Sequence, residues 1–230
     1  MKKVAAIMQP TYLPWAGYFN IINQVDLFVF LDDAQYSKGS WHNRNRILNR
    51  EKVIWSTIPL KKNLSKKKIN EYVVSDCNNW KLDHSNLFKE CYLTHPYFEC
   101  VQEIINFLQL LSTDNLASIN ISIIKFICQK LNIDVSFEKS SINKFNGIRT
   151  DKLINILNFY NVTEYVSPQG SKDYLAEDKF LEKTRIKLNF NKFQSKPYTQ
   201  FCSNNFYENL SILDVLANLG WSGTKAYINV

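Results

Sequence analysis

Short apolar runs near the start of the chain give way abruptly to polar and aromatic clusters. Residues 4–8 and 27–31 have the length and composition of two buried strands, and residues 14–23 between them predict a helix with proline in its first turn. The pattern is that of a strand, helix, strand unit in a parallel sheet. Ligands of such sheets bind outside the carboxyl ends of the strands. The residues at these ends that could form a site are Gln9, Pro10, Tyr12, Asp32 and Asp33.

The middle of the chain has the period of helices. Apolar residues recur every three or four positions in three segments, at residues 80–91, 98–108 and 116–131. Such stripes are typical of helix faces that pack in a core. They predict a helical subdomain around residues 80–131, inserted into the α/β pattern.

The α/β pattern then returns. A strand near residues 135–138, a helix near residues 150–160 and a strand near residues 163–167 predict a second βαβ unit, again with polar residues after its last strand. Residues 185–190 alternate as a half-buried strand, and a helix capped by Ser211 is expected to end at Gly220.

The order of elements predicts an α/β fold in one domain over residues 1–230. We expect a mostly parallel, Rossmann-like sheet with flanking helices and the central helical insertion. A chain of 230 residues with 45% hydrophobic content can bury a full core. The first apolar run is shorter than a signal-peptide core, and no stretch approaches the roughly 20 apolar residues of a membrane span. We therefore expect a cytoplasmic protein with no membrane span.

The five cysteines predict neither disulfides nor a zinc site, because their number is odd and none forms a C-x-x-C pair. We expect buried free thiols instead. No pair of histidines or cysteines has the spacing of metal ligands, so no metal is expected. The cysteines are Cys77, Cys91, Cys100, Cys128 and Cys202.

The formal charge of +7 suggests an anionic partner. Part of the excess lies in the sequence KKNLSKKK at residues 61–68, which we expect to be a solvated loop between strands at residues 53–58 and 69–74. The same run could contact a phosphate-bearing ligand, a nucleic acid or an acidic membrane surface, and the sequence leaves these alternatives open.

Several known catalytic signatures are missing. The chain has neither a Walker A sequence nor G-x-G-x-x-G, and Ser167 lacks a nucleophile elbow. Where nucleotidylyltransferases have H-x-G-H, this chain has the four residues from Trp15 to Tyr18. Both imidazoles that would stabilise the transferred phosphorus are therefore absent, and adenylyl transfer by that mechanism is not supported.

Among the three histidines, His42 is the candidate site residue. His84 is expected at a helix surface and His95 in a turn before proline. His42 lies in the donor-rich sequence SWHNRNRI and could act as a general base. The alternative is a strand edge whose arginines reach into solvent. Asp33, or Asp32 beside it, could orient a substrate amine or accept its proton, or it could cap the following turn.

Seven motifs spread over nearly the whole chain resemble those of the WbqC-like family, bacterial proteins associated with O-antigen and other surface-polysaccharide gene clusters. Trp80 also fits this resemblance. The motifs are Q-P-x-Y-L-P-W-x-G-Y-F from Gln9, D-x-F-V-F-L-D-D from Asp26, S-W-x-N-R-N-R-I from Ser40, H-P-Y-F from His95, Y-V-S-x-x-G-S-K-D-Y-L from Tyr165, P-Y-x-Q from Pro197 and L-S-I-L-D-x-L-x-N-x-G from Leu210.

The chain departs from the family pattern at three positions. Met8 stands where the family often has histidine, His42 where it often has glutamine, and Pro168 where it commonly has glycine. Met8 cannot transfer a proton, and His42 is not a family requirement. The candidate catalytic residues are Asp33, His42 and Asn43. The candidate substrate-binding residues are Gln9, Tyr12, Trp15, Tyr18, Arg44, Ser167, Gln169, Lys172, Tyr174 and Gln200.

The resemblance implies a role in surface-polysaccharide biosynthesis, and the basic balance and strand-end polar clusters fit an anionic, hydroxyl-rich substrate. We expect an enzyme acting on a nucleotide-linked or lipid-linked sugar, as an acyl or aminoacyl transferase onto the amine of a nucleotide-linked amino sugar. Asp33 would accept the amine proton, Asn43 and Ser167 would bind hydroxyls or the oxyanion, and Arg44 or Lys172 would hold phosphate. No tightly bound cofactor is expected, and an acyl thioester or ATP could be a co-substrate. The candidate partners are the nucleotide-linked sugar, an acyl carrier or CoA thioester, and a second copy of the chain.

Two other functions remain open. One is a non-catalytic nucleotide-sugar binding protein in a polysaccharide assembly complex, which predicts binding without turnover. The other is nucleic-acid binding through the lysine run. We do not expect a nucleic acid as partner, and such binding would have to show a steep dependence on salt.

Overall fold

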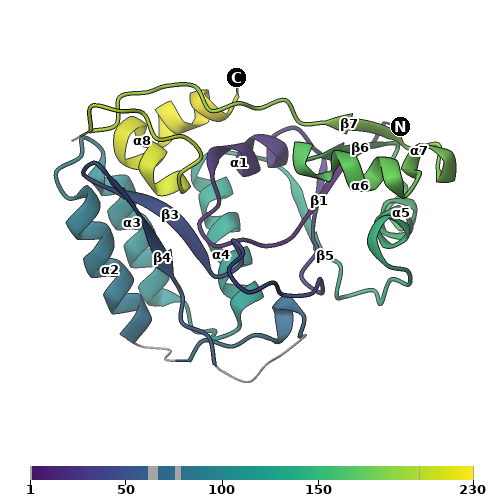
Figure 1. Ribbon diagram of the computed structural model, residues 1–230, viewed down its shortest axis with the longest axis horizontal. Coiled ribbons are helices and arrows are strands. Elements are labelled where there is room, and N and C mark those ends of the chain that lie inside the picture. Colours follow the sequence, from purple (N-terminus) through teal and green to yellow (C-terminus); the bar gives the residue numbers. More distant parts are fainter. Residues whose placement is uncertain (1, 62–66, 76–78, 202, 230) are drawn as a thin grey trace.

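The computed structural model describes residues 2–61, 67–75, 79–201 and 203–229. Its centre is a parallel sheet of five strands in the order β5-β2-β1-β6-β7 (Figure 1). The predicted Rossmann-like α/β fold is therefore confirmed, with the strand order reversing between β1 and β6. The strands are β1 (Val4–Met8), β2 (Leu27–Phe30), β5 (Ser136–Lys139), β6 (Glu164–Ser167) and β7 (Lys187–Phe190).

The two faces of the sheet are covered by different helices, so its central strands are apolar on both sides. Ala6 and Phe28 face one core together with residues of α1 (Ala16–Ile22) and α8 (Ile212–Ile228). Ala5 and Val29 face the other. That second core contains residues of α5 (Arg149–Phe159), α6 (Lys172–Glu177) and α7 (Phe180–Lys183).

Three helices and a hairpin extend the first core. The helices α2 (Asn79–Tyr92), α3 (Phe98–Leu110) and α4 (Leu116–Lys130) lie where the apolar periodicity predicts them. The antiparallel strands β3 (Arg44–Asn49) and β4 (Lys52–Thr57) form the hairpin, and β3 packs against α2. The apolar side chains of these helices join Phe28 in a single cluster, so the insertion shares its core with the sheet.

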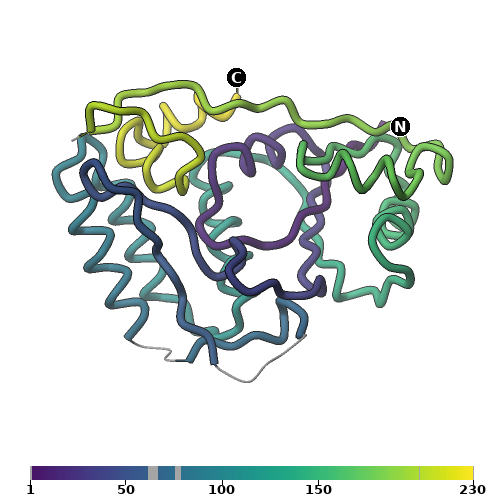
Figure 2. The backbone as a smooth tube through the Cα atoms, in the orientation of Figure 1, coloured from purple at the N-terminus to yellow at the C-terminus, as the bar shows by residue number. Residues whose placement is uncertain are grey.

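A long connection links the two ends of the molecule. Figure 2 shows the chain leaving β7 and running along the top of the view to the loop that precedes α8. Ile212 of α8 then donates its backbone N–H to Pro14 O at 3.0 Å. The last helix is thereby attached to the segment that follows β1.

The strand expected at residues 69–74 is wrong. A short 3-10 helix, η1 (Ile69–Glu71), begins there because the Glu71 carboxylate accepts the Lys68 backbone N–H at 2.8 Å and closes a turn. Val73 and Val74 then make only isolated bridges. The expected solvated loop lies largely outside the described residues, which resume at residue 67.

Three of the expected buried thiols are present as predicted, at Cys91, Cys100 and Cys128. Cys77 and Cys202 lie outside the described residues. None of the helices in the described ranges has the length and apolar character needed to cross a membrane.

The last helix is interrupted where the sequence predicts its end. Gly220 has φ 65° and ψ −178°, a combination that is essentially restricted to glycine, and the chain then resumes helical geometry to Ile228. The expected end at Gly220 is therefore a break within a longer element. The backbone approaches Tyr97 closely here, because Tyr97 donates its N–H to Ala217 O at 3.0 Å.

Replacing Gly220 with alanine is expected to lower the free energy of unfolding by about 1–3 kcal/mol, the usual cost of such a backbone conformation in a residue with a side chain. The added Cβ would also lie 2.8 Å from Tyr97 Cδ1. Urea denaturation of the two proteins measures the difference. Gly170→Ala is the control, because no atom lies within 4 Å of its new Cβ. Equal stability of the two variants would contradict the expectation.

Candidate functional site

The turn after β1 is held by hydrogen bonds from distant side chains. Asn120 Nδ2 donates to Pro10 O at 3.2 Å and to His42 O at 2.7 Å. Asn45 Nδ2 donates to Leu13 O at 2.7 Å, and Ser211 Oγ donates to the same oxygen at 2.9 Å. These contacts are buried and satisfy carbonyl groups that no strand or helix would bind. They fix the position of Gln9, at the start of the turn, against α4, β3 and α8.

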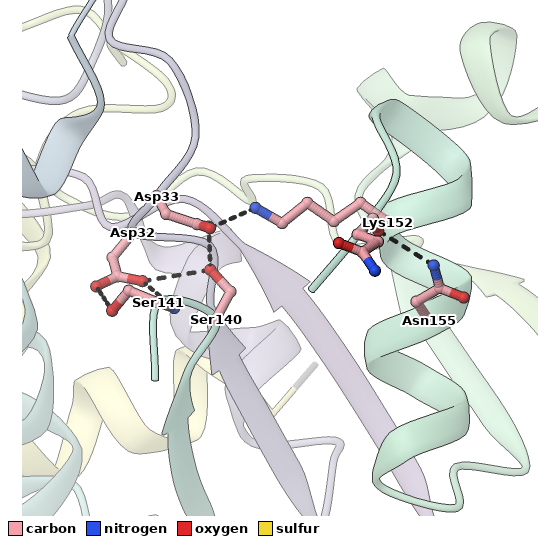
Figure 3. Close-up of polar contacts among 7 residues, drawn as sticks. Asp32, Asp33, Ser140, Ser141, Lys152 and Asn155 are labelled. Carbon is pink, nitrogen blue, oxygen red and sulfur yellow. Dashed lines mark hydrogen bonds and ion pairs between the residues drawn. The ribbon is translucent and has the colours of Figure 1, made fainter. Parts of the chain in front are cut away.

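Asp33 and Lys152 form an ion pair at the carboxyl edge of the sheet (Figure 3). Lys152 Nζ, from the first turn of α5, lies 2.5 Å from Asp33 Oδ2, and the Ser140 hydroxyl donates to Asp33 Oδ1. Burial of this carboxyl favours its neutral form, but the hydrogen bonds from Lys152 and Ser140, together with the charges of Lys152 and Lys68, outweigh burial and hold the pKa of Asp33 below its usual value. Asp33 is therefore an ionised acceptor at neutral pH.

Asp32 has a different task. Its side chain is buried and accepts bonds from Ser141 N at 3.0 Å, Ser141 Oγ at 2.6 Å and Ser140 Oγ at 3.3 Å. These bonds join the turn after β2 to the turn after β5, as Figure 3 shows. Of the two adjacent carboxylates, Asp32 thus stabilises the fold and Asp33 is the one that borders a cavity.

A charged cavity of about 680 Å³ opens beside the Asp33–Lys152 pair. Its three lysines, Lys68, Lys144 and Lys152, are partly offset by Asp33 and Glu71. The lining as a whole is polar and only weakly cationic. The other lining residues are Asn70, Ser141, Phe145, Asn146 and Gly147.

A smaller cavity of about 210 Å³ lies where the strand order reverses, between the carboxyl ends of β1 and β6. We call it the switch-point cavity. It brings Gln9 and Tyr174 together, as the strand-end rule predicts. Met8 also lines it, at the position where the family pattern often has histidine. The remaining lining residues are Ile7, Leu31, Leu153, Pro168, Gly170 and Ser171.

His42 orients Gln9. The His42 Nε2 atom lies 2.8 Å from Gln9 Oε1, and Nδ1 lies 2.7 Å from the Ser40 hydroxyl. The network assigns the proton to Nε2, because an amide oxygen only accepts. Burial lowers the pKa of His42 to about 4, so the ring is neutral at physiological pH and a weak base. His42 therefore acts on the site through Gln9.

Both ends of the Asn43 side-chain amide have partners within the fold. Its Nδ2 donates to Ile58 O at 2.8 Å and its Oδ1 accepts from Tyr36 Oη at 2.9 Å. These contacts support a structural role, and the catalytic role of Asn43 stays a prediction. The prediction for His84 is wrong, because it is buried instead of lying on a helix surface. Its Nδ1 lies 2.6 Å from the hydroxyl of Tyr12.

Three residues predicted to bind substrate lie inside the protein. Tyr12 is fully buried beside His84, and Ser167 is fully buried with its hydroxyl 2.6 Å from Ser171 Oγ. Gln200 is buried and donates to Asp214 Oδ2 at 2.9 Å. Each polar group has a protein partner that the sequence did not reveal. These contacts give the three residues structural roles, and substrate binding by them stays a prediction.

The predicted residues Gln169 and Lys172 are exposed but face other parts of the surface. Gln169 Nε2 donates to Asn191 O at 2.7 Å. Lys172 lines a cavity between α6, α7 and β7, apart from Gln9. The structure does not bring these two side chains to the switch-point cavity.

An aromatic cavity of about 400 Å³ lies on the α1 face of β1 and includes two of the predicted residues, Trp15 and Tyr18. Met8 lines this cavity as well as the switch-point cavity. Arg44, also predicted, stacks instead on Trp55, with its guanidinium carbon 4.1 Å from the ring centre, and donates to Gly39 O. The remaining lining residues are Thr11, Pro14, Trp41, Asn45, Arg46 and Asn209.

Sequence reasoning missed Lys152 and its neighbours Ser140 and Ser141. The signal was available for the serines, because they follow a predicted strand in the same way that Gln9 and Asp33 do. Arg46 and Trp41 of the aromatic cavity belong to the donor-rich sequence SWHNRNRI but were not among the predicted site residues. No group of three or more His, Cys, Asp or Glu side chains suited to hold a metal ion occurs in the part of the chain that the structure describes.

Replacing Lys152 with methionine should raise the pKa of Asp33 and destabilise the protein by about 1–3 kcal/mol at pH 7, since a largely buried carboxylate loses its charged partner. The pKa of Asp33 is lower in the folded protein than in the unfolded chain, where it is about 3.9 for Asp. The ionised carboxylate therefore stabilises the fold at pH values above the unfolded-state pKa. This stabilisation is lost as the pH falls through the folded-state pKa. The deficit of the variant should therefore shrink below about pH 4. Chemical denaturation at several pH values measures it.

The control for this variant is Lys179→Met, which removes an exposed lysine 3.6 Å from Glu182. Exposed ion pairs of this kind contribute between zero and about 1 kcal/mol to the free energy of unfolding. A Lys152→Met deficit no larger than that of the control, or one that does not change with pH, would refute the coupling.

All three histidines should stay neutral between pH 5 and 8, because burial lowers the pKa of His42, His84 and His95 to about 4. Nitrogen-15 NMR should show His42 as the Nε2–H tautomer. Since the unfolded chain protonates near pH 6.5, stability should decline as the pH falls from about 6.5 to 4. A titration midpoint above pH 6 for His42 would contradict this assignment.

Comparison with known proteins gives consistent results. A protein-family model, the WbqC-like protein family, matches residues 9–226. The uncharacterized protein Rv1507c of Mycobacterium tuberculosis (strain ATCC 25618 / H37Rv) is 33% identical over 225 residues, which cover 96% of this chain and 95% of that protein. No solved structure matches the chain. With motifs, matched length and a full-length relative in agreement, the chain belongs to the WbqC-like protein family.

Proposed function

We propose that this protein transfers an acyl or aminoacyl group to the amine of a nucleotide-linked amino sugar, as a cytoplasmic step in surface-polysaccharide (O-antigen) biosynthesis. The observation that carries the proposal is the pairing of Asp33 with Lys152 at the carboxyl edge of the sheet, next to the switch-point cavity that Gln9 lines. Consecutive residues Lys152 and Leu153 of α5 line the two cavities, so these open at the same edge.

The proposed chemistry needs an acceptor for a proton and donors for an oxyanion. The sugar amine attacks the carbonyl carbon of a thioester, the carbon–sulfur bond breaks, and the thiolate leaves. Asp33 takes the proton that the amine loses and passes it to the leaving thiolate, so the protonation of the protein is unchanged after one turnover. Lys152 lies where it can stabilise negative charge on the carbonyl oxygen. Gln9, oriented by His42, binds a sugar hydroxyl.

Activation of the acyl group can come from either of two co-substrates. A thioester carries an activated carbonyl already. A free amino acid needs ATP: its carboxylate first attacks the α-phosphorus and displaces pyrophosphate, and AMP then takes the place of the thiolate as the group that leaves when the sugar amine attacks. Neither route requires a tightly bound cofactor, and the transfer step uses the same residues in both.

A second candidate is a protein that binds the nucleotide-linked sugar without transferring a group. The observation that favours it is the weakness of both bases at the site. Hydrogen bonds from Lys152 and Ser140 and the charges of Lys152 and Lys68 together outweigh burial and hold the pKa of Asp33 low, whereas burial alone lowers that of His42 to about 4. A weak base contributes less to proton abstraction at neutral pH. The binding arrangement would be the same in both candidates.

Incubation of the purified protein with nucleotide-linked amino sugars tests the transferase. The co-substrates are acyl thioesters in one arm and amino acids with ATP in the other. Mass spectrometry should show the added group. Asp33→Asn is expected to lower kcat by about 100-fold or more with a smaller change in sugar affinity, the usual effect of removing a general base.

The control is Asp173→Asn, which makes the same change at an exposed position. Thermal denaturation of both variants separates loss of chemistry from loss of fold. Sugar binding without a mass gain in any combination would discard the transferase in favour of the binding protein. Failure of the sugars to bind at millimolar concentration would discard both.

A further inference from the structure

The aromatic cavity holds a cation that lacks a carboxylate partner. Among the residues that the structure describes, no Asp or Glu pairs with Arg46, and none lines this cavity. Arg46 Nη2 makes long bonds to the carbonyl oxygens of Glu208 and Asn209, at 3.4 and 3.3 Å. Its Nε is buried and has no partner within the described ranges. A half-buried guanidinium whose Nε has no partner in the described part of the chain is suited to bind an anionic ligand.

The rest of the cavity is suited to a flat ring. Trp15, Tyr18 and Trp41 supply aromatic surface, and Met8 and Pro14 supply apolar surface. The volume of about 400 Å³ lies within the range of roughly 300–1,000 Å³ that small-molecule sites occupy. Aromatic side chains stack on any nucleobase, and a guanidinium binds phosphate through two parallel bonds.

The switch-point cavity and the charged cavity are less suited to a nucleotide. The switch-point cavity, at about 210 Å³, is below the usual size of such a site. In the charged cavity, Asp33 and Glu71 offset two of the three lysines, and Phe145 is the aromatic residue of the lining. Stacking surface and an unpaired cation occur together in the aromatic cavity.

We propose that the aromatic cavity holds the nucleotide end of the substrate, with the base against Trp15 and Trp41 and a phosphate on Arg46. Met8 lines both this cavity and the switch-point cavity. A sugar linked to the phosphate would therefore extend past Met8 toward Gln9. The identity of the ligand as a nucleotide-linked sugar rests on the proposed function. The base-and-phosphate chemistry of the cavity does not depend on transfer.

Equilibrium binding to the full chain tests the proposal, measured by calorimetry and by quenching of tryptophan fluorescence. The probes are uridine, thymidine, guanosine and adenosine diphosphates, the corresponding nucleosides, and inorganic pyrophosphate. At least one nucleoside diphosphate should bind at least 10-fold more tightly than its nucleoside and than pyrophosphate, because base and phosphate are held by different groups of one cavity.

Two pairs of variants locate the bound probe. Arg46→Gln should weaken binding of the diphosphate by about 10-fold or more, whereas Arg185→Gln, the same charge change at an exposed position, should leave it within about 2-fold. Trp41→Leu should weaken binding of the nucleotide but not of pyrophosphate. Phe201→Leu is its control, since Phe201 is exposed to a similar degree as Trp41 but does not line the cavity.

The outcomes separate this inference from the proposed function. If Lys68→Gln or Lys144→Gln weakens binding and Arg46→Gln does not, the phosphate lies in the charged cavity and the inference is overturned while the transferase stands. If Arg46 governs binding but no group is transferred, the inference stands and the transferase falls. Should Arg46→Gln fail to fold, Arg46→Lys keeps the charge without the paired donors and should still weaken binding by several-fold. No measurable binding of any diphosphate at millimolar concentration would overturn the inference.

Discussion

Burial of the turn after β1 is the constraint on which the rest of the site depends. A buried loop contains carbonyl groups that have no hydrogen-bond partner in a helix or a sheet. Leaving each of them without a partner would cost about 1–3 kcal/mol of stability. Here Asn120, Asn45 and Ser211 supply the missing donors from three distant segments. The same contacts fix Gln9 beside one cavity and Trp15 beside another. Buried polar residues thus determine the positions of the residues that line the cavities.

The polar groups at the carboxyl edge have divided tasks. Asp32 joins two turns through three hydrogen bonds, whereas the adjacent Asp33 borders the charged cavity. His42 is buried and neutral and acts by holding the Gln9 amide. Neighbouring residues of one type therefore differ in role because their side chains leave the backbone in different directions. A site of this kind presents few groups directly to a ligand, and each is supported by several that are not exposed.

Much of the fold could be predicted from the sequence because its signals are local. Apolar runs of about five residues followed by polar clusters gave the parallel strands, and apolar periodicity gave α2, α3 and α4. The expected strand at residues 69–74 failed because a capping bond between Glu71 and the Lys68 backbone closes a turn there. That hydrogen bond spans only three residues. An alternating pattern of apolar residues needs a longer segment to be recognised, so the pattern did not reveal the turn.

Less of the site could be predicted, because its decisive contacts are not local. The strand-end rule placed Gln9, Asp33 and Tyr174 beside cavities. It could not show that Tyr12 meets His84, which is 72 residues away, or that the Ser167 hydroxyl is used within the core. Polar side chains near strand ends look alike in a sequence whether they are exposed or satisfied by distant partners.

The partners of Asp33 also determine whether the charged cavity can form. Ser140 and Lys152 are 107 and 119 residues away from it along the chain. Each contact closes a loop of more than 100 residues, which costs conformational entropy. The carboxylate has its low pKa only where β5 and α5 are docked on the sheet. The charged cavity and the ionised state of Asp33 therefore depend on the same two elements, so loosening either of them would alter both.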